Sequence, residues 1–596
     1  MATITANLNG GDLITPDNEL TYKIYGSSDN YASPIATVGS ANTDANVSVN
    51  AGVVTIENVD LGTENVFKMS SVDEAGNESE LSDAISRVNI FTNEVLGLSL
   101  GYVGYGANIE VDLRRSSNDD VQTFTPAEII DGTLITFCGS GSGFVTAWRD
   151  ITNNISLVQT DTDAQPRLVN SGVLETNYGK PALYFDGVDD FLEENTFTLA
   201  QPFTAIAVQR IEGGGLFGSQ GNDSDINVFS GGTEQLVGRA GSALVSTNNQ
   251  IGLNENRIVS IIANGASSKL RFDAVENQTG DAGSGGLNGI FIGKAERNGT
   301  RFLTGYISEF RLFSVDESTN ILNIEKTIAK FWYDLPASAN IFLHGGQSNA
   351  EGRYSTDGSD GTGTPSYLTN NIVDGVKVYN GNVITDLDLS ITSAFDIIED
   401  VIRTGGSGRS VGDTPPGRSF ENWAFADVAF KEINDSIGNV IVLGLSKGGT
   451  SLTSDWINNG GLLSELEDKY NKLISKFNAF QVPYNVRGMI WHQGERDGVT
   501  GQQAQYQASW TTFISRIRTL TGNANFPIFY GTISEDSEGG AYNTVVKAAQ
   551  LDTAAGDANL YCRDNTDLTL FDTAHFDAAS QLTFGQWTRQ NYIDNY

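Results

Sequence analysis

The chain has 596 residues, which predicts three or four domains at roughly 100–200 residues each. Its formal net charge of −37 argues against a nucleic-acid partner and against docking on anionic lipid, because like charges repel. Two cysteines, Cys138 and Cys562, exclude a disulfide framework, and three scattered histidines argue against a zinc or iron site. We expect no signal peptide in "MATITANLNGG" and no membrane insertion, since a membrane helix needs about 20 apolar residues.

Residues 1–92 have the pattern of short strands separated by turns. The stretch "LTYKIYGSS" alternates polar and apolar residues, and "DEAGNES" is typical of a turn. This pattern predicts an N-terminal β-sandwich. The stretch "VDEAGNESELS" resembles fibronectin type III modules, and the alternative is any small sandwich that serves as a spacer.

Residues 93–335 again contain short strands with Gly, Asn and Asp between them, and no segment before Asn320 has a helical period. They predict a β jelly roll that forms one domain. Three stretches resemble concanavalin-A-like lectin (laminin-G-like) domains: "FCGSGSGFVTAWRDITNN", "GKPALYFDGVDDFLEEN" and "GYISEFRLFS". The resemblance implies either glycan binding or a role in holding other domains. A helix is expected at Asn320–Leu335. We expect no cofactor, apart from a structural calcium ion in the Asp-rich stretches of the β domains.

The period changes in residues 336–596, where short apolar strands alternate with amphipathic helices. This alternation predicts a parallel sheet covered by helices on both faces, so that functional loops meet at the carboxyl ends of the strands. The expected strands are "NIFLHG", "NVIVLGLS", "VRGMIWHQ", "FPIFYGTIS" and "NLYCRD". The expected helices are Glu421–Asn434, Leu462–Phe480 and Gln502–Leu520, with another at the C-terminus.

Ser348 follows the first of these strands in "IFLHGGQSNAEGR", where two glycines precede a single serine. A serine hydroxyl becomes a nucleophile when a histidine accepts its proton and a carboxylate orients that histidine. His344 and His492 lie within strands, whereas His575 lies in the polar loop "FDTAHFDAAS". Asp572 precedes His575 by three residues, a spacing that lets its carboxylate meet Nδ1 in a turn. An isolated Asp and His with this spacing more often form a helix cap with a surface histidine.

The remaining glycine-rich loops supply candidate donors for an oxyanion, which needs two or three of them. The backbone N–H of Ser348 lies at a helix start, "KGGTS" offers the N–H of Gly448 or Gly449, and "QGE" offers the amide of Gln493. All of these loops fall at the same edge of the predicted sheet.

The blocks "GQSNAEG", "GGTSLTSDW", "WHQGERD" and "DTAH" resemble, in this order, those of SGNH (GDSL-like) hydrolases of the sialate O-acetylesterase and acetylxylan esterase branch. The resemblance covers residues 336–596 and implies a three-layer α/β/α fold that removes O-acetyl groups from carbohydrate. It implies a nucleophile, an orienting acid and a general base, together with oxyanion donors and loop supports. In that order the catalytic residues are Ser348, Asp572 and His575; the oxyanion donors are Ser348, Gly448 (or Gly449) and Gln493; the supports are Asn349, Gly449, Glu495 and Asp497.

Two features test how far the resemblance extends. Ala350 stands where the family usually has methionine, which leaves the acyl or sugar preference open. Glu495 and Asp497 could instead form a glycosidase pair, which would need carboxylates about 5–10 Å apart across a cleft. The segment 353–420 is expected to shape the substrate cleft.

The domain composition suggests where the protein acts. Two β modules ahead of a deacetylase suggest a phage tail spike, fibre or other virion receptor-binding protein that deacetylates a host cell-surface polysaccharide, alongside other virion tail proteins. Phage spikes are commonly homotrimers, although no coiled-coil heptad appears here. The alternatives are a glycan-binding adhesion protein with an inactive esterase fold and a secreted, extracellular acetylxylan-type esterase.

Overall fold

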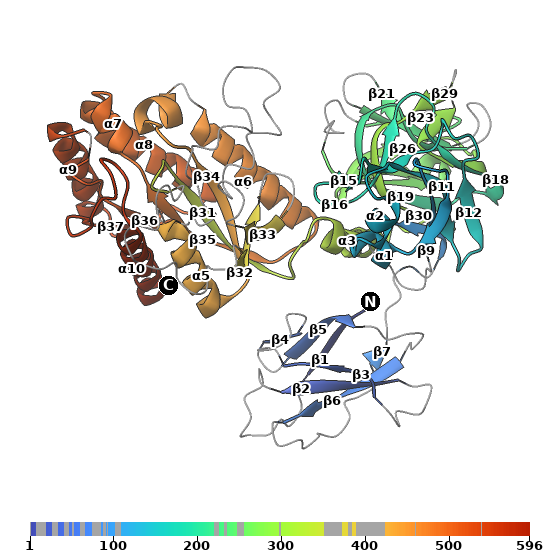
Figure 1. Ribbon diagram of the computed structural model, residues 1–596, viewed down its shortest axis with the longest axis horizontal. Coiled ribbons are helices and arrows are strands. Elements are labelled where there is room, and N and C mark those ends of the chain that lie inside the picture. The colour runs from blue at the N-terminus through green and yellow to red at the C-terminus, as the bar shows by residue number, and fades with distance from the viewer. Residues whose placement is uncertain are drawn as a thin grey trace. The chain divides into compact units, whose positions relative to one another are not determined.

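The computed structural model contains two compact units, Met1–Ile328 and Ala329–Tyr596, which we describe separately (Figure 1). The expected division into domains at 1–92, 93–335 and 336–596 stays a prediction. The structure describes residues 2–7, 20–26, 34–40, 47–50, 53–59, 66–73, 85–86, 91, 93–101, 109–219, 226–231, 235–246, 255–296, 300–350, 372–379, 384–388, 424–458, 461–537 and 539–596.

The N-terminal strands form two small antiparallel sheets. Tyr22 and Ile24 are buried and alternate with half-buried Thr21 and Lys23, so the predicted strand pattern is confirmed here. The fibronectin-like sandwich itself stays a prediction. One sheet contains β1 (Ala2–Asn7), β5 (Val53–Val59) and β4 (Val47–Asn50); the other contains β3 (Pro34–Val38), β2 (Thr21–Gly26), β6 (Val66–Val72) and β7 (Ile85–Ser86).

The rest of the first unit is a large antiparallel sheet whose strand pairings close on themselves around an apolar core. The strand-rich prediction is confirmed, while the jelly-roll topology stays a prediction. The strands are β8 (Glu94–Ser99), β9 (Ile109–Arg115), β10 (Val121–Phe124), β11 (Gly143–Asp150), β12 (Ile155–Val158), β13 (Arg167–Asn170), β14 (Val173–Leu174), β17 (Leu183–Asp186), β18 (Leu192–Leu199), β19 (Phe203–Gly213), β20 (Gly215–Gly218), β21 (Ile226–Gly231), β22 (Gln235–Ala240), β23 (Ala243–Val245), β24 (Arg257–Ala263), β25 (Ser268–Phe272), β26 (Val275–Gly280), β27 (Leu287–Ile292) and β30 (Thr304–Phe313). Two short pairs are β15 (Thr176–Asn177) with β16 (Lys180–Pro181), and β28 (Lys294–Glu296) with β29 (Thr300–Phe302).

The expectation of no helix before Asn320 is wrong, because α1 (Pro126–Ile130) and α2 (Thr133–Cys138) precede it. Both are too short to show a helical period. A capping box in which Thr125 and Glu128 bond each other's backbone N–H starts α1, and it was the available sequence signal. A short 3-10 turn, η2 (Gly265–Ser267), also lies in this unit.

The predicted helix at Asn320–Leu335 is confirmed as α3 (Ile321–Trp332), which buries Ile324 and Ile328. Its fully buried Glu325 is neutralised by Arg271, with 2.8 Å between Oε2 and Nη2.

The second unit contains a seven-stranded sheet in the order β33-β32-β34-β31-β35-β36-β37. All neighbouring pairs are parallel except β32 with β33. The strand β31, which comes first in the sequence of this unit, lies inside the sheet between β34 and β35. The strands are β31 (Ala339–Gly346), β32 (Ile372–Tyr379), β33 (Ile384–Asp388), β34 (Val440–Ser446), β35 (Tyr484–His492), β36 (Ile528–Gly531) and β37 (Leu560–Arg563).

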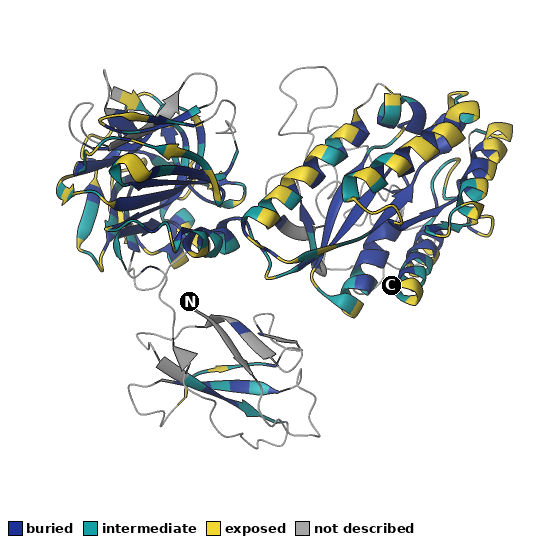
Figure 2. Ribbon diagram, turned by 180° about the vertical axis from the view of Figure 1, so that it is seen from behind, coloured by how far each residue is buried: buried dark blue, intermediate teal, exposed yellow. Residues whose placement is uncertain are grey.

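Helices cover both faces of this sheet, as predicted (Figure 1). On one face α5 packs against α10, and on the other α8 packs against α9 and α6 against β34. Strands β34 and β36 are entirely buried and β31 almost so, whereas the helices expose their outer sides (Figure 2). The helices are α5 (Phe425–Ile437), α6 (Leu462–Ala479), α7 (Glu495–Val499), α8 (Gln503–Thr521), α9 (Ala541–Ala555) and α10 (Ala578–Asn595), with a π-helix, η4 (Leu452–Asn458).

Aromatic side chains pack on both sides of the sheet. Beneath α5 and α10, Phe425 and Phe584 stack with ring centroids 4.0 Å apart. On the other side Trp491 contacts Trp456 and Phe513, at 4.7 and 4.4 Å between centroids. Burial on both faces explains why these strands read as continuous apolar runs.

Several elements of this unit were not predicted. Strands β32 and β33 lie within the 353–420 segment, where Gly375 and Asp374 interrupt the apolar pattern. Helix α9 lacks an apolar stripe, because it buries the polar residues Asn543, Lys547 and Gln550. In the π-helix η4 each hydrogen bond spans one residue more than in an α-helix, a form that no simple period predicts.

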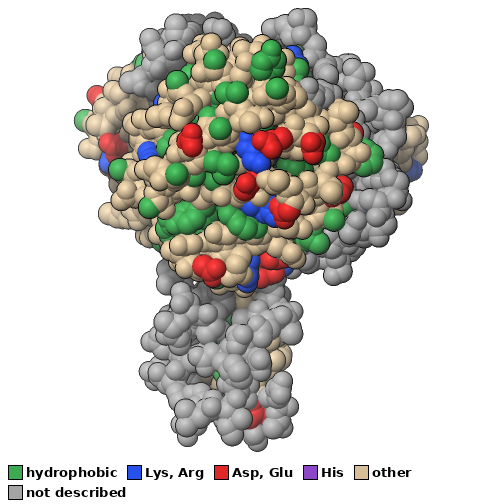
Figure 3. Space-filling view, turned by 90° about the vertical axis from the view of Figure 1, so that its left-hand side faces the viewer, with side chains coloured by type: hydrophobic (Ala, Val, Ile, Leu, Met, Phe, Trp, Pro, Cys, Tyr) green, Lys and Arg blue, Asp and Glu red, His purple; other side chains and the backbone are tan. Residues whose placement is uncertain are grey.

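The acidic composition is partly balanced by local ion pairs. Arg518 bonds Asp557, Arg563 lies 2.8 Å from Asp567, and Lys547 lies 3.0 Å from Asp564. Acidic and basic side chains also lie side by side on the face drawn in Figure 3. Within the described ranges, no helix is both long and apolar enough to span a membrane.

Candidate active site

Ser348 owes its place to the glycines that end β31. Gly346 has φ +145°, and a Cβ there would lie 2.0 Å from the carbonyl oxygen of His492 on β35. A Cβ on Gly345 would lie 2.9 Å from the ring of Trp491. Only glycine therefore lets β31 approach β35 and then turn, and the bond from Ala350 N–H to Gln347 O (2.8 Å) closes that turn.

Ser348 makes no hydrogen bond to any described residue. The residue is 6% exposed, and neither its Oγ nor its backbone N–H has a hydrogen-bond partner among the described residues. No bond joins Oγ to His575, a contact that often tightens only when substrate binds. A free hydroxyl and a free N–H are what a nucleophile and an oxyanion donor require.

Asp572 and His575 form the predicted contact. Oδ2 of Asp572 lies 2.8 Å from Nδ1 of His575, and Oδ1 accepts the backbone N–H groups of Ala574 and His575, both at 2.7 Å. Partial burial raises the pKa of Asp572, but these hydrogen bonds together outweigh it, and the pKa is lowered overall. The carboxylate thus stays ionised and leaves Nε2 of His575 as the ring's remaining nitrogen.

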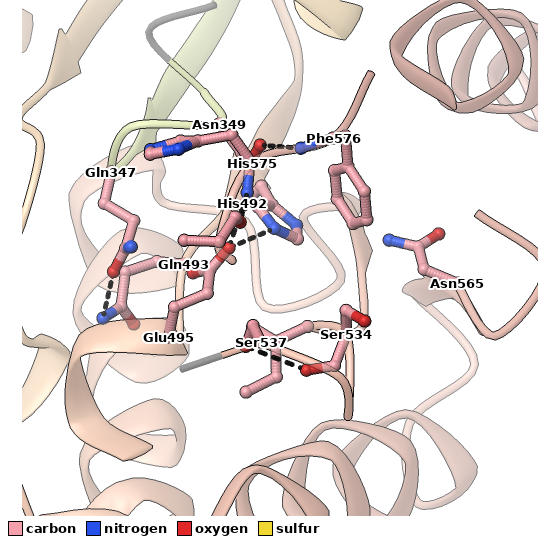
Figure 4. A network of polar contacts seen from close by, with 12 residues as sticks. Gln347, Asn349, His492, Gln493, Glu495, Ser534, Ser537, Asn565, His575 and Phe576 are labelled. Carbon is pink, nitrogen blue, oxygen red and sulfur yellow. Dashed lines mark hydrogen bonds and ion pairs between the residues drawn. The ribbon is translucent and has the colours of Figure 1, made fainter. Parts of the chain in front are cut away.

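Asn349 joins the serine turn to the histidine loop (Figure 4). Its Oδ1 accepts the N–H of Phe576 at 2.9 Å, and its Nδ2 donates to the carbonyl oxygen of Ala574 at 3.1 Å. The residues on both sides of His575 are thereby held by the residue that follows Ser348.

Behind Asn349 lies a buried pair, His492 and Glu495. Nε2 of His492 is 3.0 Å from Oε1 of Glu495, which also accepts Nδ2 of Asn349 at 2.8 Å (Figure 4). Burial raises the pKa of Glu495, but the interactions with His492 and Asn349 lower it by more, so the pKa is lowered overall. His492 is fully buried and therefore out of reach of a substrate.

His344 is likewise excluded as a base at the site. It is fully buried, and burial lowers its pKa to about 4. Its two ring nitrogens lie 3.2 Å from the carbonyl oxygens of Ile490 and Ala350.

Asp497 holds the glycine loop after β34. Its carboxylate accepts Ser451 Oγ and Leu452 N–H, both at 2.8 Å. Gly449 has φ +70°, and its N–H has no partner in the described part of the chain. The choice between Gly448 and Gly449 as oxyanion donor stays a prediction.

The side chain of Gln493 is already engaged. Its Nε2 donates to Asp497 Oδ2 at 2.6 Å and to Thr450 O at 3.0 Å, and lies 3.3 Å from Gln347 Oε1. The structure thus brings Gln493 beside the loops, as expected, with both amide hydrogens donated to the protein. Sequence reasoning did not single out Gln347, although it lies in the quoted "GQSN" block.

The glycosidase alternative is disfavoured by burial. Glu495 is 5% exposed and Asp497 fully buried, and each carboxylate bonds protein groups. Neither is placed to reach across a cleft.

Three carboxylates of the first unit gather closely enough to hold a metal ion: Asp186, Asp189 and Asp190, with oxygens within 4.8 Å of one another. Exposed acidic groups commonly gather without an ion, so the expected calcium stays a prediction.

Comparison with known proteins bears on the second unit. Residues 338–594 match the family described as carbohydrate esterase, sialic acid-specific acetylesterase. This stretch is similar to that family. The match covers less than half of the chain, and it supports esterase activity for that part. No curated protein gives a match to the chain.

Several solved structures are similar to parts of the chain at low sequence identity and low TM-score. An Arabidopsis thaliana protein shares 21% identity over 44% of this chain and 99% of its own, with a TM-score of 0.32. A carbohydrate acetylesterase from Xanthomonas citri shares 14% over 68% and 69%, with a TM-score of 0.30. NanS shares 13% over 44% and 98%, with a TM-score of 0.30.

Asn349→Ala should lower the kcat for acetyl ester hydrolysis by up to about 100-fold, because the His575 loop loses both of its bonds to the serine turn. The matched control is Asn595→Ala, which removes an exposed amide at the end of α10. A kcat for Asn349→Ala within threefold of wild type would contradict the role of Asn349 in positioning the His575 loop.

Proposed function

We propose that residues 336–596 hydrolyse O-acetyl groups of carbohydrate through Ser348, His575 and Asp572. The observation that carries the proposal is a Ser348 hydroxyl that bonds no described residue, in a turn that Asn349 ties to the backbone on both sides of the carboxylate-bound His575. The carbohydrate esterase match over the same residues supports the substrate class.

In the proposed mechanism, Ser348 Oγ attacks the acetyl carbonyl carbon while Nε2 of His575 takes its proton. The tetrahedral oxyanion accepts hydrogen bonds from Ser348 N–H, from Gly448 or Gly449 N–H, and from a glutamine side chain. His575 then protonates the leaving sugar oxygen, and the C–O bond breaks to leave acetyl-Ser348. Water attacks this ester with His575 again as base, which releases acetate and restores the hydroxyl. Asp572 orients His575 and balances its transient positive charge.

The natural substrate we propose is an O-acetylated polysaccharide of a host cell surface, reached by a phage tail spike, fibre or receptor-binding protein. Support comes from the strand-rich first unit and from the resemblance of its sequence to lectin-like domains in phage proteins. Assembly with other tail proteins and a homotrimeric state belong to the same proposal. An extracellular bacterial esterase is the alternative setting.

A second function, glycan binding by the first unit, is favoured by one row of side chains. Arg167, Tyr184, Tyr306 and Arg210 are direct cross-strand neighbours on β13, β17, β30 and β19. The two rings are 5.1 Å apart between centroids and remain partly exposed. Each ring is covered on one face by an arginine, at 4.8 and 4.3 Å.

This row matches the chemistry of a polysaccharide chain better than that of an anionic ligand. Glu175 lies 2.7 Å from Arg167, and Glu212 lies 3.1 Å from Arg210, so both cations are already neutralised. Apolar ring surface beside paired donors and acceptors suits the C–H faces and hydroxyls of sugar rings.

Acetate release from acetylated bacterial polysaccharide, with p-nitrophenyl acetate as a second substrate, tests the esterase. Wild type should release acetate, and Ser348→Ala should lower kcat by several orders of magnitude, because triad members act as a unit. Ser436→Ala, which removes an exposed hydroxyl on α5, should leave the rate unchanged. A loss of less than tenfold in Ser348→Ala would refute the assignment.

Binding of acetylated polysaccharide in affinity gel electrophoresis tests the second function, with Ser348→Ala as the background to prevent turnover. Adding Tyr184→Ala and Tyr306→Ala should weaken binding by about tenfold or more, equivalent to about 1.4 kcal/mol. Tyr542→Ala, at an exposed tyrosine of α9, is the matched control. Unchanged affinity in the double tyrosine variant would argue against the row as a binding surface.

A further inference from the structure

Two glutamines meet beside the nucleophile, and their amide groups are in different states. Gln493 Nε2 lies 3.3 Å from Gln347 Oε1 (Figure 4). Gln493 is the side-chain oxyanion donor that the family resemblance implies. The hydrogen-bond directions decide which of the two amides can donate to a substrate.

The amide of Gln493 has one possible orientation. Its nitrogen faces Asp497 Oδ2 at 2.6 Å and Thr450 O at 3.0 Å, and both of these atoms only accept. Rotating the amide by 180° would place its oxygen against a carboxylate and a carbonyl. To donate to an oxyanion, Gln493 would have to release one of these bonds inside a site where Asp497 is fully buried.

The amide of Gln347 is also fixed, but with its nitrogen free. Its Oε1 accepts the backbone N–H of Arg496 at 3.3 Å, and a backbone N–H can only donate. Nε2 must therefore point away from Arg496. Gln347 Nε2 has no hydrogen-bond partner in the described ranges. It is also not one of the fully buried polar atoms that lack a partner, so it is accessible to solvent.

We propose that Gln347 Nε2, not Gln493 Nε2, is the side-chain donor to the acetyl oxygen as it becomes an oxyanion. Gln347 directly precedes Ser348 in the turn, so its donor accompanies the nucleophile and its free N–H. Gln493 then acts as a positioning residue that holds the Oε1 of Gln347 and the loop at Thr450. This inference rests on the proposed esterase function.

The two ends of the Gln347 amide can be tested separately. Gln347→Glu keeps an oxygen that accepts the N–H of Arg496, but it removes the donor. Gln347→Leu removes both, and Gln507→Glu on the exposed side of α8 is the matched control. Kinetics with p-nitrophenyl acetate, thermal melting and inhibition by methylboronic acid, whose tetrahedral adduct on serine mimics the oxyanion, provide the readouts.

Gln347→Glu and Gln347→Leu should each lower kcat by about 100- to 1,000-fold, with KM and Tm little changed. The inhibition constant for methylboronic acid should rise in parallel with the loss of kcat, a response that a structural role would not produce. Kinetics within threefold of wild type in both variants would overturn the proposal. So would a loss of kcat and boronate affinity in Gln493→Leu, at unchanged Tm, that exceeds the loss in Gln347→Leu.

The failure of this inference is distinct from the failure of the proposed function. If wild type releases acetate and Ser348→Ala does not, the esterase stands whichever glutamine donates. If wild type is inactive on every acetyl ester and gains no Tm with methylboronic acid, the proposed function fails, and the inference fails with it.

Discussion

The side chain of Asn349 is the contact on which the rest of the site depends. Its amide bonds the backbone on both sides of His575 and the carboxylate of Glu495, three groups that come from two distant loops. Ser348 and His575 come from different loops, and no hydrogen bond between the two is found among the described residues, so their own contact does not align them. The hydrogen bonds of the Asn349 side chain to the backbone of Ala574 and Phe576 instead hold the two loops in place, and a substrate does not need to displace them.

This arrangement requires charges in the interior, and each of them has a partner. Glu495 faces His492, and Asp497 collects bonds from Ser451, Leu452 and Gln493. An unpaired charge at these depths would cost several kcal/mol, so removing one partner should disturb the loops well beyond the contact itself. Glu495 and Asp497 are buried and bonded within the protein, whereas Asp572 is partly exposed and directed at the imidazole of His575.

The parallel sheet and its functional edge could be predicted because they depend on local patterns. Apolar runs marked five of the seven strands of this sheet, and a glycine pair marked the carboxyl ends of β31 and β34. The three-residue spacing of Asp572 and His575 placed them in contact because a turn needs only local geometry. Strand β32 was not predicted because Asp374 and Gly375 interrupt its apolar pattern, and its place in the sheet depends on pairing with the distant strand β34. The amide orientation of Gln493 could not be predicted from the sequence, because it is set by Asp497 and Thr450, which come together only when the chain folds.

If Ser348 is the nucleophile, an organophosphate should modify it covalently. The full-length protein would be treated with diethyl p-nitrophenyl phosphate, which transfers one diethylphosphoryl group to an activated serine as p-nitrophenolate leaves. Intact mass and peptide mapping should then find a single adduct on Ser348, with activity lost in proportion and no adduct in Ser348→Ala. An active enzyme that carries the adduct on another residue, or that keeps its activity with Ser348 fully modified, would contradict the account.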